Sequence, residues 1–224
     1  NCDWSADVCS SDLKIDEFRQ LLGGRHLVLS FRDTSARIDV PETAETFEGN
    51  ALLKALAWAR YLSIDTCNLG VEWVVADDSG LEVDALGGAP GVHSARFAAM
   101  RGGETGNSAD GDNNALLLRL MADVQEARRT ARFRCVLAAV PVSDPNPGAA
   151  AYFSGECEGR LLGAGAGKHG FGYDPLFVPD GETRTFAELG MEIVGGTPAQ
   201  LTAIMKADLP KWAKVIKDSG AKLD

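Results

Sequence analysis

The sequence is short of the residues that build zinc sites, disulfide frameworks and membrane spans. Its three histidines, His26, His93 and His169, show no metal-ligand spacing. Its cysteines form no C-x-x-C pair and are odd in number, which predicts neither a zinc site nor a complete disulfide framework but a reducing, cytoplasmic environment. No apolar run approaches the roughly 20 residues that span a bilayer. The first residues carry no export-signal pattern.

Positive charge is also scarce. The 224 residues include 22 Lys and Arg against 32 Asp and Glu, a formal net charge of −10. Long-range attraction to a nucleic-acid duplex is therefore not expected, whereas a small anion that arrives with its own cation can still bind. Hydrophobic residues make up 45% of the chain, enough to bury the core of one α/β domain or of two closely packed lobes.

Apolar periodicity predicts helices between strands early in the chain and a hairpin later. The predicted helices span 14–22, 47–62 and 115–125, and the predicted strands span 26–31, 72–75, 132–142 and 149–162. A turn is expected at 87–91, a loop at 101–113, and an open hairpin loop at 143–148. This order favours an α/β domain with a mixed β-sheet over a purely parallel sheet.

The most informative segment is a pair of adjacent carboxylates at the end of an apolar run. Residues 74–76 lead into Asp77, Asp78 and Ser79, which is how an α/β enzyme often presents metal-binding and base groups at the end of a strand. Mg²⁺ prefers one or two carboxylates together with waters and substrate phosphates, and Glu42 could supply a further oxygen. The alternative is an ordinary turn, because Asp, Ser and Gly are favoured there for local reasons.

A second candidate is the glycine-rich segment 167–175. Its glycines would let a ligand approach the main chain, Phe171 or Tyr173 offers a face for stacking on a base, and Asp174 can accept hydrogen bonds from a ring edge. Such a loop would suit a purine. The alternative is a tight turn whose aromatic rings point into the core.

Lysines form a third element. Lys14 and Lys54 could bind phosphates as point charges, although most lysines are merely solvated. No Ser/His/Asp or Cys/His arrangement can be argued from the sequence, so nucleophilic catalysis by a side chain is not favoured.

Taken together, these motifs resemble the noncanonical purine nucleoside triphosphate pyrophosphatases, the inosine triphosphate pyrophosphatase or Ham1-like family. The resemblance covers residues 14–189, and its motifs occur in the family's order. They are Thr46-Phe47, Asn50 to Ala55, Ala76 to Leu81, Leu86 to Gly91, Ser94 to Phe97, Asp112-Asn113, Ala131 to Phe133, Cys135 to Leu137, Gly170 to Pro175, and Thr185 to Leu189.

The resemblance implies an α/β fold with a mixed sheet, flanking helices and two lobes around a central cleft. It also implies a cytoplasmic homodimer that uses Mg²⁺ to hydrolyse ITP, dITP or XTP to the monophosphate and pyrophosphate. Carried over by position, Asp78 would activate water and bind the metal together with Glu42. Substrate phosphates would be held by Lys14, Lys54 and Ser79, and the base would be surrounded by Phe171, Gly172, Tyr173 and Asp174. Main-chain N–H groups of that loop could supply the donors that a 6-oxo purine requires.

Both ends of the chain depart from the family pattern. Residues 1–13 resemble a translated adapter leader, with Cys9 and Ser11 where the family has Thr and Asn. The tail at 190–224 resembles the C-terminal helices of tricarboxylate-transporter solute receptors. No histidine occurs after His169, so the family's Ser-His-Arg motif is absent from this sequence. We therefore expect an impaired pyrophosphatase. The alternatives are an inactive chimeric fusion product and a solute-binding receptor fragment.

One smaller departure concerns the start of the helix at 47–62. Gly49 stands where the family has Glu, three residues after Thr46. A glutamate there would complete a capping box, so we expect this helix to begin with only half of that arrangement.

Overall fold

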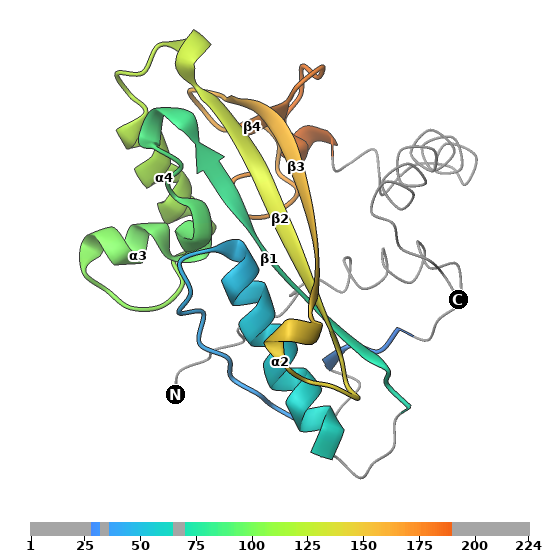
Figure 1. Cartoon of the computed structure of the whole chain (residues 1–224). Helices are drawn as coiled ribbons and strands as arrows, with labels where there is room; N and C mark the ends of the chain where they lie inside the picture. Colours follow the sequence, from blue (N-terminus) through green and yellow to red (C-terminus); the bar gives the residue numbers. More distant parts are fainter. Residues whose placement is uncertain (1–27, 32–35, 65–69, 190–224) are drawn as a thin grey trace.

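The computed structural model describes residues 28–31, 36–64 and 70–189 (Figure 1). The predicted helix at 14–22, Lys14, the leader and the tail at 190–224 lie outside these residues. Within them the main elements are α2 (Phe47–Ile64), β1 (Trp73–Val83), α3 (Phe97–Gly102), α4 (Asp110–Leu120), β2 (Thr130–Pro141), β3 (Ala151–Leu161) and β4 (Phe177–Pro179). Short 3-10 helices are η2 (Asp84–Leu86), η3 (Gly91–Arg96), η4 (Glu126–Arg128) and η5 (Pro147–Ala149).

The described strands form one sheet in the order β1-β2-β3-β4. Each neighbouring pair is antiparallel, and the β1–β2 register runs without interruption from Trp73 opposite Pro141 to Val83 opposite Ala131. The predicted hairpin of two long strands is confirmed as β2 and β3. No helix in the described ranges is long and apolar enough to cross a membrane.

The prediction of a short buried strand at 72–75 that ends at the acidic pair is wrong. β1 continues for eleven residues, and Asp77 and Asp78 lie in its middle. Trp73 and Val75 are about half exposed, at 53% and 50%. A full antiparallel ladder with β2 carries the strand through the polar residues, because its main-chain hydrogen bonds do not require apolar side chains.

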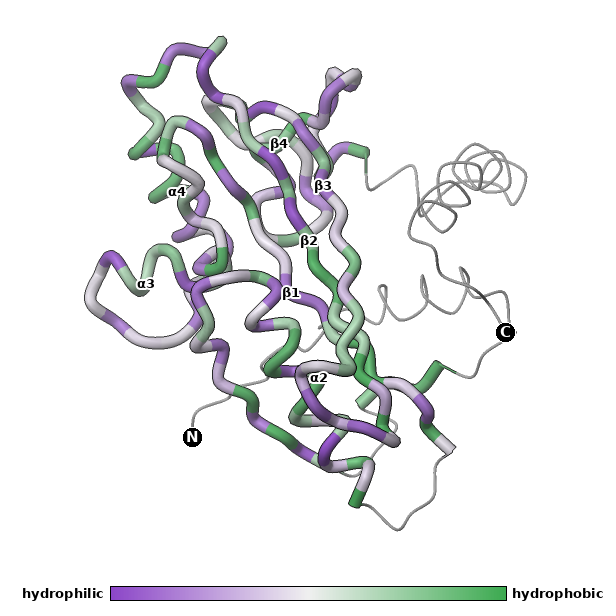
Figure 2. The backbone as a smooth tube through the Cα atoms, viewed as in Figure 1, coloured by the Kyte–Doolittle hydropathy of each residue, from purple (hydrophilic) through white to green (hydrophobic). Residues whose placement is uncertain are grey.

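The two hydrophobic clusters lie on opposite faces of this sheet. One joins Ala51, Ala55 and Ala59 of α2 to Ala76 and Ala138 of β1 and β2. The other is built from the last two odd-numbered side chains of β1, α4 and the segment around β4. It comprises Leu81, Val83, Leu117, Met121, Ala131, Leu161, Tyr173, Leu176 and Phe177. Figure 2 shows the strands changing from hydrophobic beside α2 to more hydrophilic toward β4.

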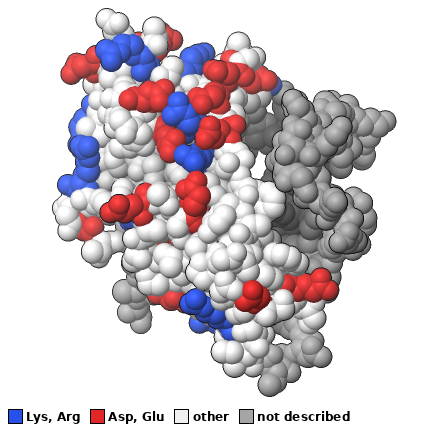
Figure 3. Space-filling model, viewed as in Figure 1, with Lys and Arg blue, Asp and Glu red and all other residues white. Residues whose placement is uncertain are grey.

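The hydrophilic part of the α2-side face carries interleaved charges (Figure 3). Arg132 pairs with Glu82, Asp84 and Glu158. Arg134 reaches Glu48 on α2 and Glu156 on β3. These pairs explain why this end of the sheet needs no helix over it, since cross-strand pairs of opposite charge stabilise a solvated face.

The predicted helix at 47–62 is confirmed by α2. The helix predicted at 115–125 is partly wrong, because α4 begins at Asp110 and ends at Leu120, so the predicted loop at 101–113 shrinks to residues 103–109. Acidic residues at 110 and 112 in the first turn favour that earlier start. Residues 28–31, the described part of the strand predicted at 26–31, contain no strand.

Candidate active site

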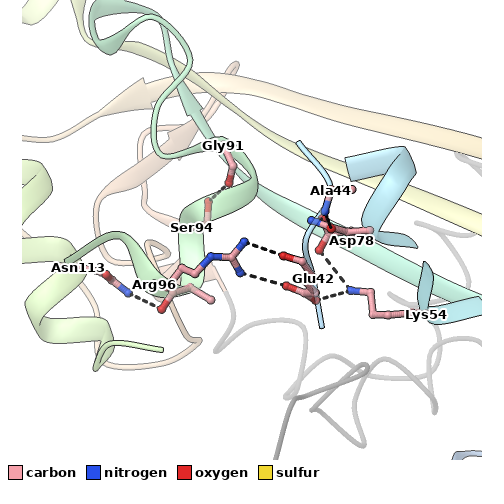
Figure 4. A network of polar contacts seen from close by, with 10 residues as sticks. Glu42, Ala44, Lys54, Asp78, Gly91, Ser94, Arg96 and Asn113 are labelled. Carbon is pink, nitrogen blue, oxygen red and sulfur yellow. Dashed lines mark hydrogen bonds and ion pairs between the residues drawn. The ribbon is translucent and has the colours of Figure 1, made fainter. Parts of the chain in front are cut away.

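The candidate site lies where α2 crosses β1. Strand alternation turns Asp78 toward α2, where it is buried with 8% of its surface exposed. Asn50 and Lys54 stand one helical turn apart on α2, so both reach the same strand residue. Figure 4 shows Asp78 and Lys54 converging with Glu42 from the segment before the helix.

Lys54 joins the two carboxylates. Its Nζ lies 2.8 Å from Glu42 Oε1 and 3.2 Å from Asp78 Oδ1. The lysine is only 5% exposed, although lysine side chains are usually solvated. A buried ammonium between two carboxylates stays charged. The cluster therefore presents one positive and two negative groups to a ligand.

Asn50 fixes the other oxygen of Asp78. Its Nδ2 donates to Asp78 Oδ2 at 3.1 Å, and its Oδ1 accepts a hydrogen bond from the Ala44 N–H at 2.9 Å. The side chain is fully buried. Asn50 therefore orients the carboxylate and also ties the segment that carries Glu42 to the start of α2.

Arg96 holds Glu42 from the other side. Its guanidinium lies 3.4 Å from Glu42 Oε2 and donates to the Glu42 carbonyl oxygen at 3.3 Å. Each oxygen of this carboxylate therefore faces a different cation, Lys54 or Arg96. This fork fixes the position of Glu42 more firmly than a single ion pair would.

Burial and charge shift the pKa values of the central pair. Burial raises the pKa of Asp78, and Glu42 adds to the rise, while Lys54 and Asn50 only partly oppose it. Burial alone would lower the pKa of Lys54, but the Asp78 and Glu42 carboxylates raise it above its ordinary value. At neutral pH the lysine stays charged, and Asp78 is a stronger base than an exposed aspartate.

The position of Arg96 depends on a close approach between β1 and η3. A Cβ at Gly80 would come within 2.5 Å of the Gly91 carbonyl oxygen and of Ser94 Oγ, so only glycine fits there. Ser94 Oγ accepts the Leu81 N–H at 2.9 Å and donates to the Gly91 carbonyl at 2.7 Å. The residues Gly80, Gly91 and Ser94 therefore dock η3 on β1 next to Asp78.

The glycine-rich loop presents one aromatic ring and buries the other. Phe171 is 64% exposed, whereas Tyr173 is 3% exposed, packs in the core and donates from its hydroxyl to the Ser94 carbonyl at 3.0 Å. Of the two stacking candidates, the structure therefore leaves Phe171 accessible. Asp174 Oδ2 accepts the Phe171 N–H at 3.0 Å, and burial raises the pKa of this carboxyl.

Three main-chain donors in this loop are already used within the protein. The Phe171, Gly172 and Asp174 N–H groups bond to Asp174 Oδ2, Asp110 Oδ2 and the Phe171 carbonyl, respectively. The expectation that these N–H groups supply donors for a purine oxygen is therefore not met at these three positions. At these three positions the loop main chain is held by the protein itself.

The structure brings together some predicted site residues and separates others. Asp78, Lys54 and Glu42 meet as expected. Ser79 is exposed, and strand alternation places its side chain on the face of β1 opposite to that of Asp78, so the two do not converge. Lys14 lies outside the described residues. Sequence reasoning gave no role to Asn50 or Arg96; the i, i+4 spacing of Asn50 and Lys54 was the available signal.

The described residues contain no group of three or more His, Cys, Asp or Glu side chains that could hold a metal ion by itself. The acidic part of the site consists of two carboxylates. A cation that binds here would need further oxygen ligands from water or from the substrate.

The fold and the site define an α/β protein with a buried carboxylate–lysine pair beside a glycine-rich loop that exposes an aromatic ring. The chain belongs to the Ham1 family, whose model matches residues 8–196. That match extends beyond both ends of the resemblance at 14–189, and the boundaries of the leader and tail remain predictions.

Similar proteins agree with the family assignment. The chain is 43% identical over 195 residues to the dITP/XTP pyrophosphatase of Desulforamulus reducens, covering 87% of this chain and 88% of that protein. It is 40% identical over 208 residues to the dITP/XTP pyrophosphatase of Geobacillus kaustophilus, covering 92% and 93%.

Solved structures give the fold. The Staphylococcus aureus Ham1 protein matches with a TM-score of 0.67 and 31% identity, covering 92% of this chain and 97% of that chain. A nucleoside-triphosphatase / dITP/XTP pyrophosphatase from Mycobacterium abscessus matches with a TM-score of 0.65 and 34% identity, covering 91% and 94%. The predicted fold class, an α/β fold with a mixed sheet and flanking helices, is confirmed by these structures. The strands described in this chain pair antiparallel.

Proposed function

We propose that this chain is a Mg²⁺-dependent nucleoside triphosphate pyrophosphatase that converts dITP, ITP or XTP to the nucleoside monophosphate and pyrophosphate. The observation that carries the proposal is the buried Asp78 held between Lys54 and Asn50 in a member of the Ham1 family. The name dITP/XTP pyrophosphatase, borne by relatives that match most of the chain, supports the substrate class.

The donor set fits Mg²⁺. The Glu42 and Asp78 carboxylates lie near each other, since both contact Lys54 Nζ, and a hard cation prefers such oxygens. These two residues would hold the ion, with the remaining ligands coming from water and substrate phosphates. When bound, Mg²⁺ offsets the charge of the triphosphate and lowers the pKa of bound water.

The chain's own residues then have distinct tasks. Asp78 accepts the proton of the attacking water, whose oxygen bonds to the α-phosphorus while the bond to the bridging oxygen breaks and pyrophosphate leaves. The raised pKa of Asp78 suits this role as a base. Lys54 stays charged and binds a phosphate oxygen as a point charge. Lys14 is proposed as a further phosphate contact, whereas Ser79, on the opposite face of β1, is no longer assigned to this role.

The glycine-rich loop is assigned to the base. Phe171, with its exposed ring, stacks on the purine, while Gly172, Tyr173 and Asp174 shape the rest of the pocket. We also propose that the protein works in the cytoplasm as a homodimer, which sedimentation at several protein concentrations would test.

The altered ends are proposed to lower turnover. Cys9 and Ser11 replace the family's Thr and Asn, and the Ser-His-Arg motif is missing from the sequence, so groups that grip phosphate and base are lost. We expect a higher KM for dITP than that of the Geobacillus kaustophilus relative assayed beside it. An equal KM would contradict this part of the proposal.

The direct test identifies the products formed from dITP in the presence of Mg²⁺. We expect dIMP and pyrophosphate in equal amounts, with no release when the metal is chelated. D78N should lower kcat about 100-fold or more, because it removes the base. The matched control D123N replaces an exposed aspartate in the turn after α4 and should keep the wild-type rate. Release of dIDP and phosphate, or full activity of D78N, would contradict the assignment.

A further inference from the structure

Helix α4 grips a single residue of the glycine-rich loop by both of its main-chain polar groups. Asp110 Oδ2 accepts the Gly172 N–H at 2.7 Å, and Asn114 Nδ2 donates to the Gly172 carbonyl at 2.9 Å. Asp110 and Asn114 are spaced i, i+4, so they project from the same face of the first turns of α4. The contact joins residues that are 62 and 58 positions apart in sequence.

The gripped residue lies between the exposed ring and the buried one. Gly172 adopts a left-handed backbone conformation with φ of 56°, which L side chains rarely adopt. Phe171 precedes it and points to solvent, whereas Tyr173 follows it and anchors in the core. The orientation of the Phe171 ring therefore depends on how Gly172 is held.

The hydrogen bonds of Asn114 indicate that Gly172 determines the orientation of its side-chain amide. Within the described part of the chain, Asn114 Oδ1 is buried and has no hydrogen-bond partner. Exchanging the amide oxygen and nitrogen would not help, because it would set an oxygen against the Gly172 carbonyl. An unsatisfied buried acceptor costs free energy, so the bond to Gly172 is retained despite that cost.

The residue before Asn114 on the helix bonds to a different segment. Asn113, also buried, donates to the Ala95 carbonyl and accepts the Ala98 N–H, which fixes the end of η3 (Figure 4). The first turns of α4 thus hold the loop on one side and the segment carrying Arg96 on the other. Among the described residues, the side-chain hydrogen bonds of Asp110 and Asn114 go to the loop and not to the acidic site, so their effect can be separated from that of the site.

We propose that Asp110 and Asn114 are positioning residues for purine binding, which fix Gly172 and thereby present the Phe171 ring to the base. The inference rests on the proposed function, because it adds two residues to the base-binding part of the same site. Neither residue acts on the reacting phosphate. Their removal should weaken substrate binding and leave the chemical step almost unchanged.

The test compares five variants in dITP hydrolysis. D110A and N114A should each raise KM about tenfold, the effect of losing one hydrogen bond that a charged or rigid partner makes, with kcat within about twofold. D110N should restore most of the affinity, because its amide oxygen can still accept the Gly172 N–H. N114D should be worse than N114A, because it sets a carboxylate against a carbonyl. D112A, an exposed acidic residue on the same helical turn, is the control and should match the wild type.

Amide hydrogen exchange at Gly172 provides a readout that does not depend on turnover. The Gly172 N–H should be protected in the wild type and in D112A, and it should exchange at least about tenfold faster in D110A. If the wild type releases no pyrophosphate, the proposed function fails, and dITP affinity measured by calorimetry then replaces KM. Unchanged KM or affinity in D110A and N114A, a fall in kcat alone, or an unprotected Gly172 amide in the wild type would each overturn the inference.

Discussion

At the scale of single residues, the small side chain of Asn50 connects two parts of the site. It is fully buried, and each end of its amide satisfies a different group, the Asp78 carboxylate and the Ala44 N–H. A leucine, which is similar in shape but apolar, would remove the hydrogen bond to the Ala44 N–H and the one to Asp78 Oδ2. The residue therefore matters for stability as well as for the orientation of the proposed base.

We expect N50L to lower the free energy of unfolding by about 2 kcal/mol or more, because two buried polar groups lose their partner. Urea unfolding at neutral pH measures this loss. N107A, in the exposed loop before α4, serves as the control and should change stability by less than about 0.5 kcal/mol. An N50L protein as stable as the wild type would show that the network does not stabilise the fold.

His93 offers a pH-dependent test. Burial and the charge of Arg96 lower the pKa of this imidazole, and its Nδ1 has no hydrogen-bond partner in the described structure. A group with a lowered folded-state pKa stabilises the protein above its unfolded-state pKa, and this contribution is lost as the pH falls through the folded-state pKa.

The wild type should therefore lose stability relative to H93Q as the pH is lowered from about 7.5 to about 5, because the unfolded chain takes up a proton first. Other titrating groups are shared by the two proteins and cancel in the difference between their free energies of unfolding. Parallel pH profiles of the two proteins would refute this account of His93.

At the scale of elements, the contact between β1 and η3 positions the cation that holds Glu42. The absence of a side chain at Gly80 lets η3 lie directly on the strand. We expect G80A to lower the free energy of unfolding by about 1–3 kcal/mol, because its methyl group overlaps main-chain and hydroxyl atoms.

The matched control for that variant is G155A on β3, where an added methyl group meets no atom within 4 Å. Alanine there should be neutral or slightly stabilising, since glycine is unfavourable inside a strand. Thermal and urea unfolding of both variants decide the matter. Equal effects of G80A and G155A would mean that the close approach to η3 carries no energetic weight.

Element boundaries also show what the sequence could and could not predict. The helix at 47–62 and the hairpin of β2 and β3 follow from local apolar patterns, and the structure confirms them. The length of β1 could not be predicted, because Asp77 and Asp78 read locally as a strand end. Their position in mid-strand depends on pairing with β2 and on Lys54, both distant in sequence.

The start of α2 was also predicted from neighbouring residues alone. Thr46 Oγ1 accepts the Gly49 N–H at 3.0 Å, which is one half of a capping box. A glutamate at 49 would supply the other half, but a Cβ there would meet the Ala44 Cβ at 2.6 Å. The neighbouring segment, which carries Glu42, excludes the larger residue in this chain, and the helix begins with a single capping bond.

At the scale of the whole molecule, the sheet separates two hydrophobic clusters. The site lies where the buried face of β1 changes from the side that α2 covers to the side that packs toward α4. Asp78 stands between Ala76, which packs under α2, and Leu81, which packs toward α4. The sequence predicts most of the helices and strands that carry these clusters but not this crossing. The crossing depends on which face each helix covers, and that is decided by tertiary packing.

The motifs predicted the centre of the site better than its surroundings. Asp78, Lys54 and Glu42 were expected together and are found together. Asn50, Arg96, Asp110 and Asn114 were assigned no role. The i, i+4 spacing of Asn50 and Lys54 was a usable signal, whereas the partners of the other three lie far away in the sequence. The exposed Phe171 and buried Tyr173 could likewise not be told apart before the core was known.

The central claim is that this site hydrolyses purine triphosphates that carry a 6-oxo group. The measurement that tests it most directly compares the initial rates of pyrophosphate release from dITP and from dATP, at equal concentration and with Mg²⁺. We expect at least about tenfold faster release from dITP, because a 6-amino group leaves partners at that position unsatisfied. Turnover of dATP as fast as dITP would contradict the account.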